Sequence, residues 1–459
     1  MKTKQSHILL ALLMGVALLA TSCRVGKSYT RPDLHLPDTL AAAQDSASMG
    51  DLDWRELYAD STLRRLIDRS LEYNKDLLVA AARIKEMAAR KRISTAALLP
   101  DINGKITTER ELENHGGDAF KRADTHTGQF LVSWEIDLWG RLRWARSAAV
   151  ADYLQSIEAR RALRMTIVSE VAQAYYELVA LDTELDIVRQ TLQAREEGVR
   201  LARIRFAGGL TSETSYRQAQ VEMARTATLV PDLERQISLK ENDIAFLAGD
   251  YPRRIPHARS LSDFSFPDSL PVGMPSALLQ RRPDIRQAEQ QLIAAHARAK
   301  VAYTNMFPRL SLTGGFGTES TDLASFLKSP YAIMDGALLT PVFGWGKNRA
   351  NWKASKAAFE AETHIYEKSV LEAFKEARNA IVNFNKIKEI HALRTKLEYS
   401  AKSAMDLAQL QYINGYINYL DVLDAQRGYF DAQIGLSNAV RDEMIAVVQL
   451  YKALGGGWR

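Results

Sequence analysis

Cysteine is almost absent from this chain of 459 residues, which contains only one, Cys23. A single cysteine cannot form a disulfide within the chain. The eight histidines are scattered, and none has the spacing of a metal-binding set. The sequence also contains no nucleophile elbow and no glycine-rich loop that leads into a helix start. We therefore expect no enzymatic activity, no metal and no cofactor.

A large excess of charge of one sign is also missing. Lys and Arg number 60 against 55 Asp and Glu, and they are spread along helical faces. No basic run alternates with aromatic residues, as a nucleic-acid-binding patch would. This distribution is typical of a solvated surface and does not favour nucleic acid as a partner.

The N-terminal segment has the features of a secretory signal. Two lysines precede a short apolar run, residues 8–20, and the small residues Thr21 and Ser22 lead to Cys23. The run is too short to span a bilayer. We expect residues 1–22 to be removed and Cys23 to be lipidated as the new N-terminus, the alternative being a free thiol. Arg24 follows instead of an aspartate, which favours the outer membrane over the inner one.

One long pattern occurs twice in the chain. Residues 205–212 read RFAGGLTS and residues 411–418 read QYINGYIN, a shift of about 206 residues. The same shift relates Trp139-Gly140 to Trp345-Gly346. We therefore predict two related halves, each with a helix, a proline stop, a strand pair and two long helices.

The repeat and the composition together divide the chain into segments. These are a signal peptide (1–22), a lipid-anchored tether (23–60), a first repeat (61–248), a proline-rich connector (249–275), a second repeat (276–454) and a tail (455–459).

Strand pairs are predicted at 101–137 and 309–343, where apolar and polar residues alternate. Segments of about ten residues with this alternation are typical of outer-membrane strands, although a soluble half-buried hairpin gives the same pattern. About four strands per chain cannot close a membrane barrel, which takes about eight. Since open sheet edges are excluded from lipid, several copies would have to share one barrel.

Apolar residues recur every seven positions from Val171 to Phe206, which predicts coiled-coil packing. Arg195 breaks a second, partial apolar column. A helix over about 140–206 would reach roughly 100 Å at about 1.5 Å per residue. We expect it to reverse at a tip near 209 and to return in a helix interrupted near Pro231. The second repeat predicts a matching hairpin with its tip near 415.

Several motifs, taken in order and doubled, resemble the outer-membrane factor family of TolC-like efflux channels, in particular its lipidated NodT-type branch. Asn74-Lys75-Asp76-Leu77 and Arg282-Pro283-Asp284-Ile285 open helices. Leu99-Pro100 and Phe307-Pro308 precede the strands, and the most specific stretch is 412–427. The resemblance covers essentially all of residues 24–454.

The resemblance implies a mostly α-helical fold with a small β part. In a homotrimer, long coiled-coil hairpins would form a periplasmic α-barrel topped by a shared transmembrane β-barrel. The protein would be lipid-anchored in the outer membrane, extend into the periplasm and serve as a passive exit duct of a tripartite efflux system. Its implied partners are a periplasmic adaptor (membrane fusion) protein and an inner-membrane pump of the resistance-nodulation-division type, while the cargo stays open.

The resemblance also assigns roles at the helix tips. Asp421 and Asp424 lie on one helix face at i, i+3 and, with Leu420, would form a periplasmic gate. Rings of carboxylates favour cations, but a solvated acidic face is the alternative. The first copy carries Ser215 and Gln218 instead. The candidate adaptor contacts, whose glycines also fit a left-handed turn, are Gly208, Gly209, Leu210, Thr211, Gly415 and Tyr416.

Two other classes compete with a channel. A lipid-anchored periplasmic coiled-coil adaptor or scaffold would explain Cys23 and the hairpins, but not a strand pair at a helix junction in each half. A surface-anchored hydrolase is disfavoured because the sequence offers no catalytic site.

Overall fold

The structure, a computed structural model, describes residues 25–34, 36, 48–114, 121–257, 271–273 and 275–458. The predicted signal peptide, Cys23 and parts of the tether and connector lie outside the described residues. The chain forms two compact units, each built from both halves of the sequence. The first comprises Met1–Leu34, Ala82–Ile157 and Gln287–Glu367, and the second comprises His35–Ala81, Glu158–Arg286 and Lys368–Arg459.

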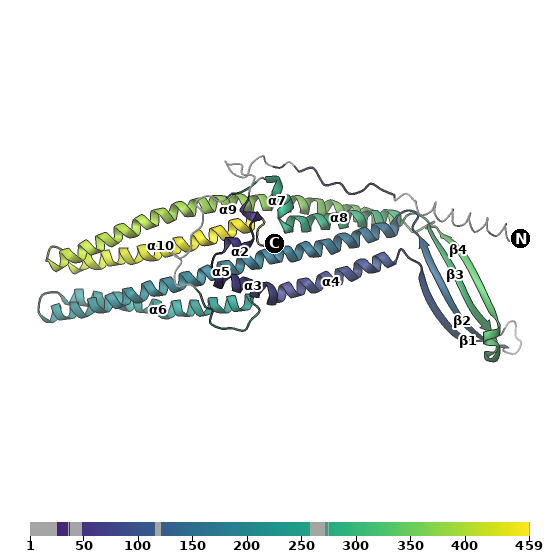
Figure 1. The fold of residues 1–459 in the computed structure, drawn as a ribbon, viewed down its shortest axis with the longest axis horizontal. Coiled ribbons are helices and arrows are strands. Elements are labelled where there is room, and N and C mark those ends of the chain that lie inside the picture. Colours follow the sequence, from purple (N-terminus) through teal and green to yellow (C-terminus); the bar gives the residue numbers. More distant parts are fainter. Residues whose placement is uncertain are drawn as a thin grey trace. The chain divides into compact units, whose positions relative to one another are not determined.

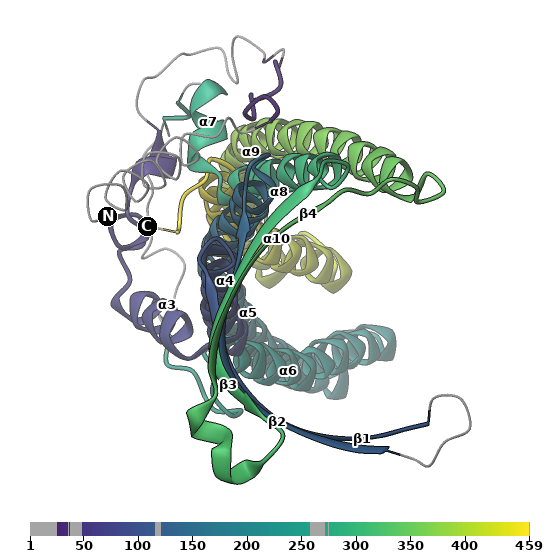
Figure 2. The same cartoon turned by 90° about the vertical axis from the view of Figure 1, so that its right-hand side faces the viewer.

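The first unit contains an antiparallel sheet in the order β1 (Asp101–Glu113), β2 (Lys121–Ile136), β3 (Arg309–Ser320) and β4 (Pro330–Leu339). β2 pairs with β3, so the sheet joins the two halves of the repeat. A 3-10 helix, η3 (Leu323–Lys328), connects β3 to β4. The strands lie side by side and the sheet is curved (Figure 2). β4 ends at Leu339, whereas the predicted strand pair extends to 343.

The sheet has one apolar and one polar face. Directly paired residues share a face, and the pairing places the apolar residues of all four strands together, in rows such as Ile102–Val132–Gly314–Met334 and Gly104–Phe130–Phe316–Ala332. The intervening positions carry polar residues such as Lys105, Gln129 and Asp335. On the apolar face Phe130 is 66% exposed and Met334 is 82% exposed. This chain alone therefore leaves a broad apolar surface uncovered.

Proline and tryptophan define the junctions between helices and strands in this unit. α4 (Lys75–Ala96) and α8 (Pro283–Thr304) each end before a proline, Pro100 or Pro308, whose ring cannot continue a helix. The Trp139 ring stacks on Phe307 with centroids 5.1 Å apart. Its Nε1 also donates to the carbonyl oxygen of Pro308 over 2.8 Å. One tryptophan thus ties the first strand-helix junction to the start of β3.

The two helical hairpins have equal lengths. α5 (Arg141–Ala207) and α9 (Lys347–Ile413) contain 67 residues each, and α6 (Glu213–Leu247) and α10 (Tyr419–Ala453) contain 35 each. In the second unit α6 lies along α5 and α10 lies along α9 (Figure 1). This equality is what duplication of one helical hairpin predicts.

The predicted interruption near Pro231 is wrong, because α6 runs through it as one helix. Proline removes one backbone hydrogen bond and crowds the preceding turn. The neighbouring Leu233 is buried against Leu185 and Val188 of α5. Packing on both sides of the proline holds the helix together.

The core of the second unit lies where the short helices α2 (Trp54–Leu57), α3 (Ser61–Tyr73) and α7 (Pro275–Arg281) meet the hairpins. Its fully buried aromatic residues include Trp54, Tyr58, Tyr175, Tyr176 and Tyr451. Val171 and Leu178 of the heptad seam are completely buried here, whereas Phe206 near the tip is 39% exposed. The seam therefore packs most tightly in its first turns.

Candidate functional site at the helical tips

The turns at the two hairpin tips have the same hydrogen bonds. Gly209 donates to the carbonyl oxygen of Phe206 (2.9 Å), and Leu210 donates to that of Arg205 (2.8 Å). In the second hairpin Gly415 donates to Tyr412 (3.0 Å) and Tyr416 to Gln411 (2.9 Å). Both pairs of bonds form a Schellman motif, which requires a left-handed residue after the helix. Gly209 (φ 71°) and Gly415 (φ 79°) supply it.

The residue after each left-handed glycine projects an apolar side chain into solvent. Leu210 is 71% exposed and Tyr416 is 82% exposed. A Cβ atom on either glycine would meet no atom within 4 Å, so the glycines are required by backbone conformation and not by crowding. Each tip thus presents one exposed apolar side chain on a hydrogen-bonded turn.

The predicted gate residues lie in the first turns of α10. Asp421 accepts a hydrogen bond from the backbone N–H of Asn418 (3.0 Å), so it caps the helix as well as carrying charge. The Asp424 side chain is 85% exposed and lies 3.9 Å from Arg427. Leu420 is 48% exposed. The structure therefore brings the three residues to an accessible surface beside the second tip.

An apolar cluster behind this surface joins the two hairpins. Tyr412 and Tyr419 of the second hairpin contact each other with ring centroids 5.3 Å apart. Together with Val422 and Leu423 they pack against the first hairpin through Ala202 and its neighbours in the cluster. This contact fixes α10 against α5 and α6 close to the tips.

A buried charge network lies deeper along the same contact, and the sequence did not reveal it as a site. Arg195 of α5 lies 3.2 Å from the carboxylate of Glu222 in α6 and donates to Thr226 Oγ1 (2.5 Å). Arg427 of α10 donates to the other oxygen of Glu222 (2.9 Å). The side chains of Arg195 and Glu222 are only 7% and 4% exposed, respectively. One buried carboxylate therefore links both helices of the first hairpin to the second hairpin.

The ionisation of this network follows from its surroundings. Burial opposes the charge on Glu222, but the hydrogen bond from Arg427 and the nearby arginines outweigh it, so the pKa of Glu222 lies below its ordinary value. Burial lowers the pKa of Arg195. The only sequence signal is that Arg195 interrupts an apolar column, since nothing local indicates that Glu222 and Arg427, 205 positions apart, meet.

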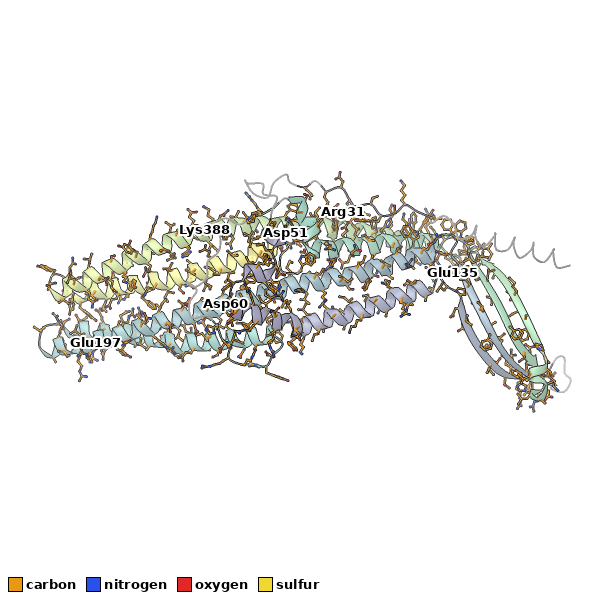
Figure 3. The ribbon with its side chains drawn as sticks, viewed as in Figure 1. Arg31, Asp51, Asp60, Glu135, Glu197 and Lys388 are labelled. Carbon is orange, nitrogen blue, oxygen red and sulfur yellow. The ribbon has the colours of Figure 1, made fainter. Side chains whose placement is uncertain are left out.

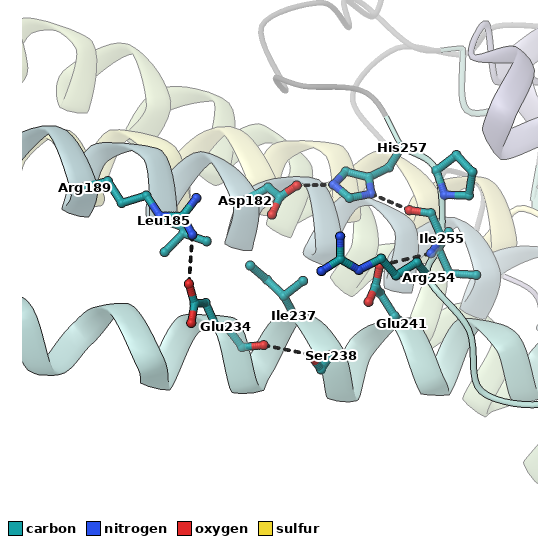
Figure 4. A pocket seen from close by; sticks show the side chains of 11 residues that line it. Asp182, Leu185, Arg189, Glu234, Ile237, Ser238, Glu241, Arg254, Ile255 and His257 are labelled. Atoms are coloured by element: carbon teal, nitrogen blue, oxygen red, sulfur yellow. Dashed lines mark hydrogen bonds and ion pairs between the residues drawn. The ribbon is translucent and has the colours of Figure 1, made fainter.

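A second polar site holds the beginning of the connector against α5 and α6 (Figure 4). His257 Nδ1 donates to the carbonyl oxygen of Ile255 (2.7 Å), and Nε2 pairs with the Asp182 carboxylate. The Ile255 N–H donates to Glu241 (3.0 Å). A cavity of about 720 Å³ lies beside these contacts and is also lined by the Arg189–Glu234 ion pair. The hydrogen bond to Asp182 raises the pKa of His257, against the opposing effect of burial.

The described part of the tether is attached to the first unit. Val25, two positions after Cys23, donates to the carbonyl oxygen of Trp139 (3.3 Å) and accepts from Trp144 Nε1 (2.9 Å). Arg31, labelled in Figure 3, makes two hydrogen bonds of 2.7 Å to Glu289. Cys23 itself lies outside the described residues. The chain that follows the predicted lipidation site is thus bound next to the start of α5.

Two kinds of site are absent from the described ranges. No group of three or more His, Cys, Asp or Glu side chains there is placed to hold a metal ion. No helix there combines the length and the apolar character needed to cross a membrane.

Comparison with known proteins identifies the class to which this architecture belongs. The outer membrane efflux protein family matches residues 66–250 and 274–456, which are the two halves of the repeat. The outer membrane protein OprJ of Pseudomonas aeruginosa is 33% identical over 96% of this chain and 95% of its own length. The probable outer membrane lipoprotein SilC of Salmonella typhimurium is 28% identical over 96% and 97%, respectively.

A solved structure agrees with these sequence matches. The open state of the Neisseria gonorrhoeae MtrE outer membrane channel superposes with a TM-score of 0.88 at 28% identity, over 95% of this chain and 99% of that one. The chain belongs to the outer membrane efflux protein family. It is an outer-membrane channel protein of an efflux system, which confirms the predicted family, fold class, function and location.

Proposed function

We propose that three copies of this chain form one channel across the outer membrane, with the hairpin tips at its periplasmic entrance. The observation that carries this proposal is the sheet, which has an exposed apolar face and, among the described residues, no strand paired with the outer edges of β1 and β4. Backbone groups at an open edge cannot be satisfied in lipid. Pairing β4 of one copy with β1 of the next removes the open edges, and the apolar faces then meet lipid.

Disulfide trapping tests the shared barrel. Thr107→Cys on β1 is combined in turn with cysteines on β4 at Tyr331, Ile333, Asp335 and Ala337, all on the polar face. One combination is expected to give a covalent ladder that ends at the trimer. Thr127→Cys, the β2 partner of Thr107, is the matched control, because β3 separates it from β4 of its own copy and β1 would separate it from β4 of the next copy. A ladder equally strong in the control, or none in any combination, contradicts the proposal.

We assign Leu420, Asp421 and Asp424 to the gate of this channel. Three-fold repetition would bring their exposed side chains together at the entrance, where rings of carboxylates select cations. Because Asp421 also caps α10, the test uses Asp421→Asn/Asp424→Asn, which keeps an acceptor oxygen. Larger single-channel conductance and weaker cation preference in planar bilayers are expected. Asp424→Glu, which keeps the charge, is the control. If the conductance and cation preference of the double variant equal those of this control, the two carboxylates are only part of a solvated surface.

We further propose that the tips dock on a periplasmic adaptor that connects to a pump of the resistance-nodulation-division type. Support comes from the equal hairpin lengths and from the exposed side chains of Leu210 and Tyr416. Substituting the glycines would also disturb the turns, so Leu210→Glu/Tyr416→Glu is the sharper variant. It should abolish efflux while trimers remain in the membrane. Undiminished crosslinking of this variant to the adaptor contradicts the assignment.

Cys23 is proposed to carry lipid that anchors the chain without forming the pore, because the sheet already supplies a surface for the membrane. Mass spectrometry of the N-terminal peptide should show a diacylated Cys23. Cys23→Ser with a cleavable signal should still give conducting trimers. If only soluble monomers form, the lipid is required for assembly.

A further inference from the structure

The apolar face of the sheet is hollowed midway along its strands. The groove has a volume of about 570 Å³, within the range of roughly 300–1,000 Å³ typical of ligand sites. Its apolar lining comprises Gly104, Ile106, Gly128, Phe130, Phe316 and Phe326. A Cβ atom on Gly128 would lie 2.7 Å from the ring of Phe326, so η3 places this ring directly over the strand. The groove is thus lined by glycines of the strands and by aromatic side chains around them.

Two arginines lie on the same face, Arg110 two paired rows beyond the groove and Arg122 three rows beyond it. Thr108 and His126 form the next paired row, joined over 3.0 Å. Beyond them Arg110 (2.8 Å) and Arg122 (2.6 Å) both donate to the carboxylate of Asp124. Two guanidinium groups share one carboxylate, so the cluster keeps a net positive charge. The arginine side chains are 61% and 54% exposed, which leaves N–H groups available.

Arg110 and Arg122 lie on the face that carries the groove. Arg110 pairs directly with Asp124, and even-numbered residues of β1 share the apolar face with Gly104 and Ile106. The neighbouring acidic residues Glu109 and Glu111 therefore point to the opposite face. Gly128 and Asp124 are about 13 Å apart along β2, at roughly 3.3 Å per residue. An apolar groove with a cationic end fits a ligand that has an acyl chain and an anionic head.

We propose that this groove binds a phosphorylated acyl-glycolipid of the outer leaflet, with one acyl chain in the groove and a phosphate group on Arg110 and Arg122. The planar guanidinium group recognises phosphate through paired hydrogen bonds. The inference rests on the proposed function, because a shared barrel would turn this face toward lipid and bring Arg110 and Arg122 to the outer leaflet. The bound lipid would fix the height of the barrel in the membrane.

Native mass spectrometry of purified trimers, titrated with diphosphorylated lipid A in detergent, tests the site. The head-group variant is Arg110→Gln/Arg122→Gln/Asp124→Asn, which removes one net positive charge. Its control is Arg309→Gln, which also removes one positive charge but lies on the opposite face and outside the groove. The groove variant is Gly104→Leu, whose Cβ meets only ordinary contacts of 3.5 Å or more. Its control is Gly314→Leu, on the same face but outside the groove, where nothing lies within 4 Å.

Selective retention of lipid A over phosphatidylcholine is expected in the native protein. Each test variant should weaken retention by roughly tenfold or more, as expected when charge-assisted hydrogen bonds or a filled groove are lost, and each control should stay within about twofold. Trimers without selective retention, or test variants equal to their controls, overturn the lipid site and leave the channel intact. The same spectra report the oligomer, so monomers alone would overturn the proposed function and this inference together.

Discussion

Replacing Glu222 by glutamine should loosen the hairpin tips, because it removes one charge from the buried network and keeps its shape. Arg195, with a side chain only 7% exposed, would keep its bond to Thr226 but lose its counter-charge. Breaking a fully buried ion pair costs about 3–5 kcal/mol. The Arg427 side chain is 43% exposed, so water can solvate its charge once the carboxylate is gone. We therefore expect a smaller cost of about 2–3 kcal/mol in the free energy of local opening of the tips.

Hydrogen exchange measures this opening directly. A loss of about 2–3 kcal/mol corresponds to roughly 30- to 150-fold faster exchange of protected amides, since about 1.4 kcal/mol is tenfold. The increase should be confined to the ends of α5, α6 and α10 near the tips. Glu213→Gln is the matched control, because its pair with Arg217 is exposed on both sides and is worth at most about 0.5 kcal/mol.

A double variant separates loss of charge balance from loss of packing. Arg195→Met/Glu222→Leu removes both buried charges and keeps apolar volume, a change that is often neutral or stabilising. It should therefore exchange much more slowly than Glu222→Gln. The reasoning is refuted if Glu222→Gln matches Glu213→Gln, or if the double variant is as labile as the single one.

Three other perturbations test named contacts. The pKa of Glu222 is lowered in the folded protein, so the ionised carboxylate stabilises the tips at pH values above its ordinary pKa, and this stabilisation is lost as the pH falls through the folded-state pKa. Hydrogen exchange at the tips should therefore become faster in acid in the native protein but not in Glu222→Gln. The pKa of His257 is raised in the folded protein, so its pairing with Asp182 stabilises the connector below about pH 6.5 and weakens as the pH rises through the folded-state pKa. Hydrogen exchange of residues 249–257 should follow this trend in the native protein, and His257→Gln should abolish it. Gly415→Ala should destabilise the protein by about 1 kcal/mol or more in thermal unfolding, because the φ angle of Gly415 is positive. Gly428→Ala should instead stabilise the protein by about 0.5–1 kcal/mol, because Gly428 lies inside α10 and a Cβ atom there would meet nothing within 4 Å.

The features that sequence predicts well are those encoded locally. The left-handed glycines, the helix stops at Pro100 and Pro308, and the alternation along β1 and β2 each depend on a few adjacent residues. Duplication strengthens every one of these signals, because each occurs once in each half of the chain. The fold class therefore follows from short-range patterns in the amino-acid sequence.

What sequence does not predict depends on distant partners. Local propensity favours a break in α6 at Pro231, but packing against Leu185 and Val188 of another helix compensates for the missing bond. Arg195 is recognisable only as a defect in an apolar column, since Glu222 and Arg427 become its neighbours only after the hairpins pack together. Tertiary contact overrides local propensity in both cases.

The two hairpins share a backbone but not a charge pattern. Helix lengths and turn hydrogen bonds repeat, whereas the positions that correspond to Arg195 and Glu222 at the shift of about 206 residues are Ala401 and Gly428. The acidic pair Asp421 and Asp424 likewise has only Ser215 and Gln218 opposite it in the first copy. The first hairpin therefore supplies the buried anion, and the second supplies both the arginine that reaches it and the exposed carboxylates. Duplication with divergence of charge has therefore made the two hairpins unlike, and the contact between them holds the exposed carboxylates of α10 in place against the first hairpin. In the channel that we propose, this contact would position these carboxylates at the entrance.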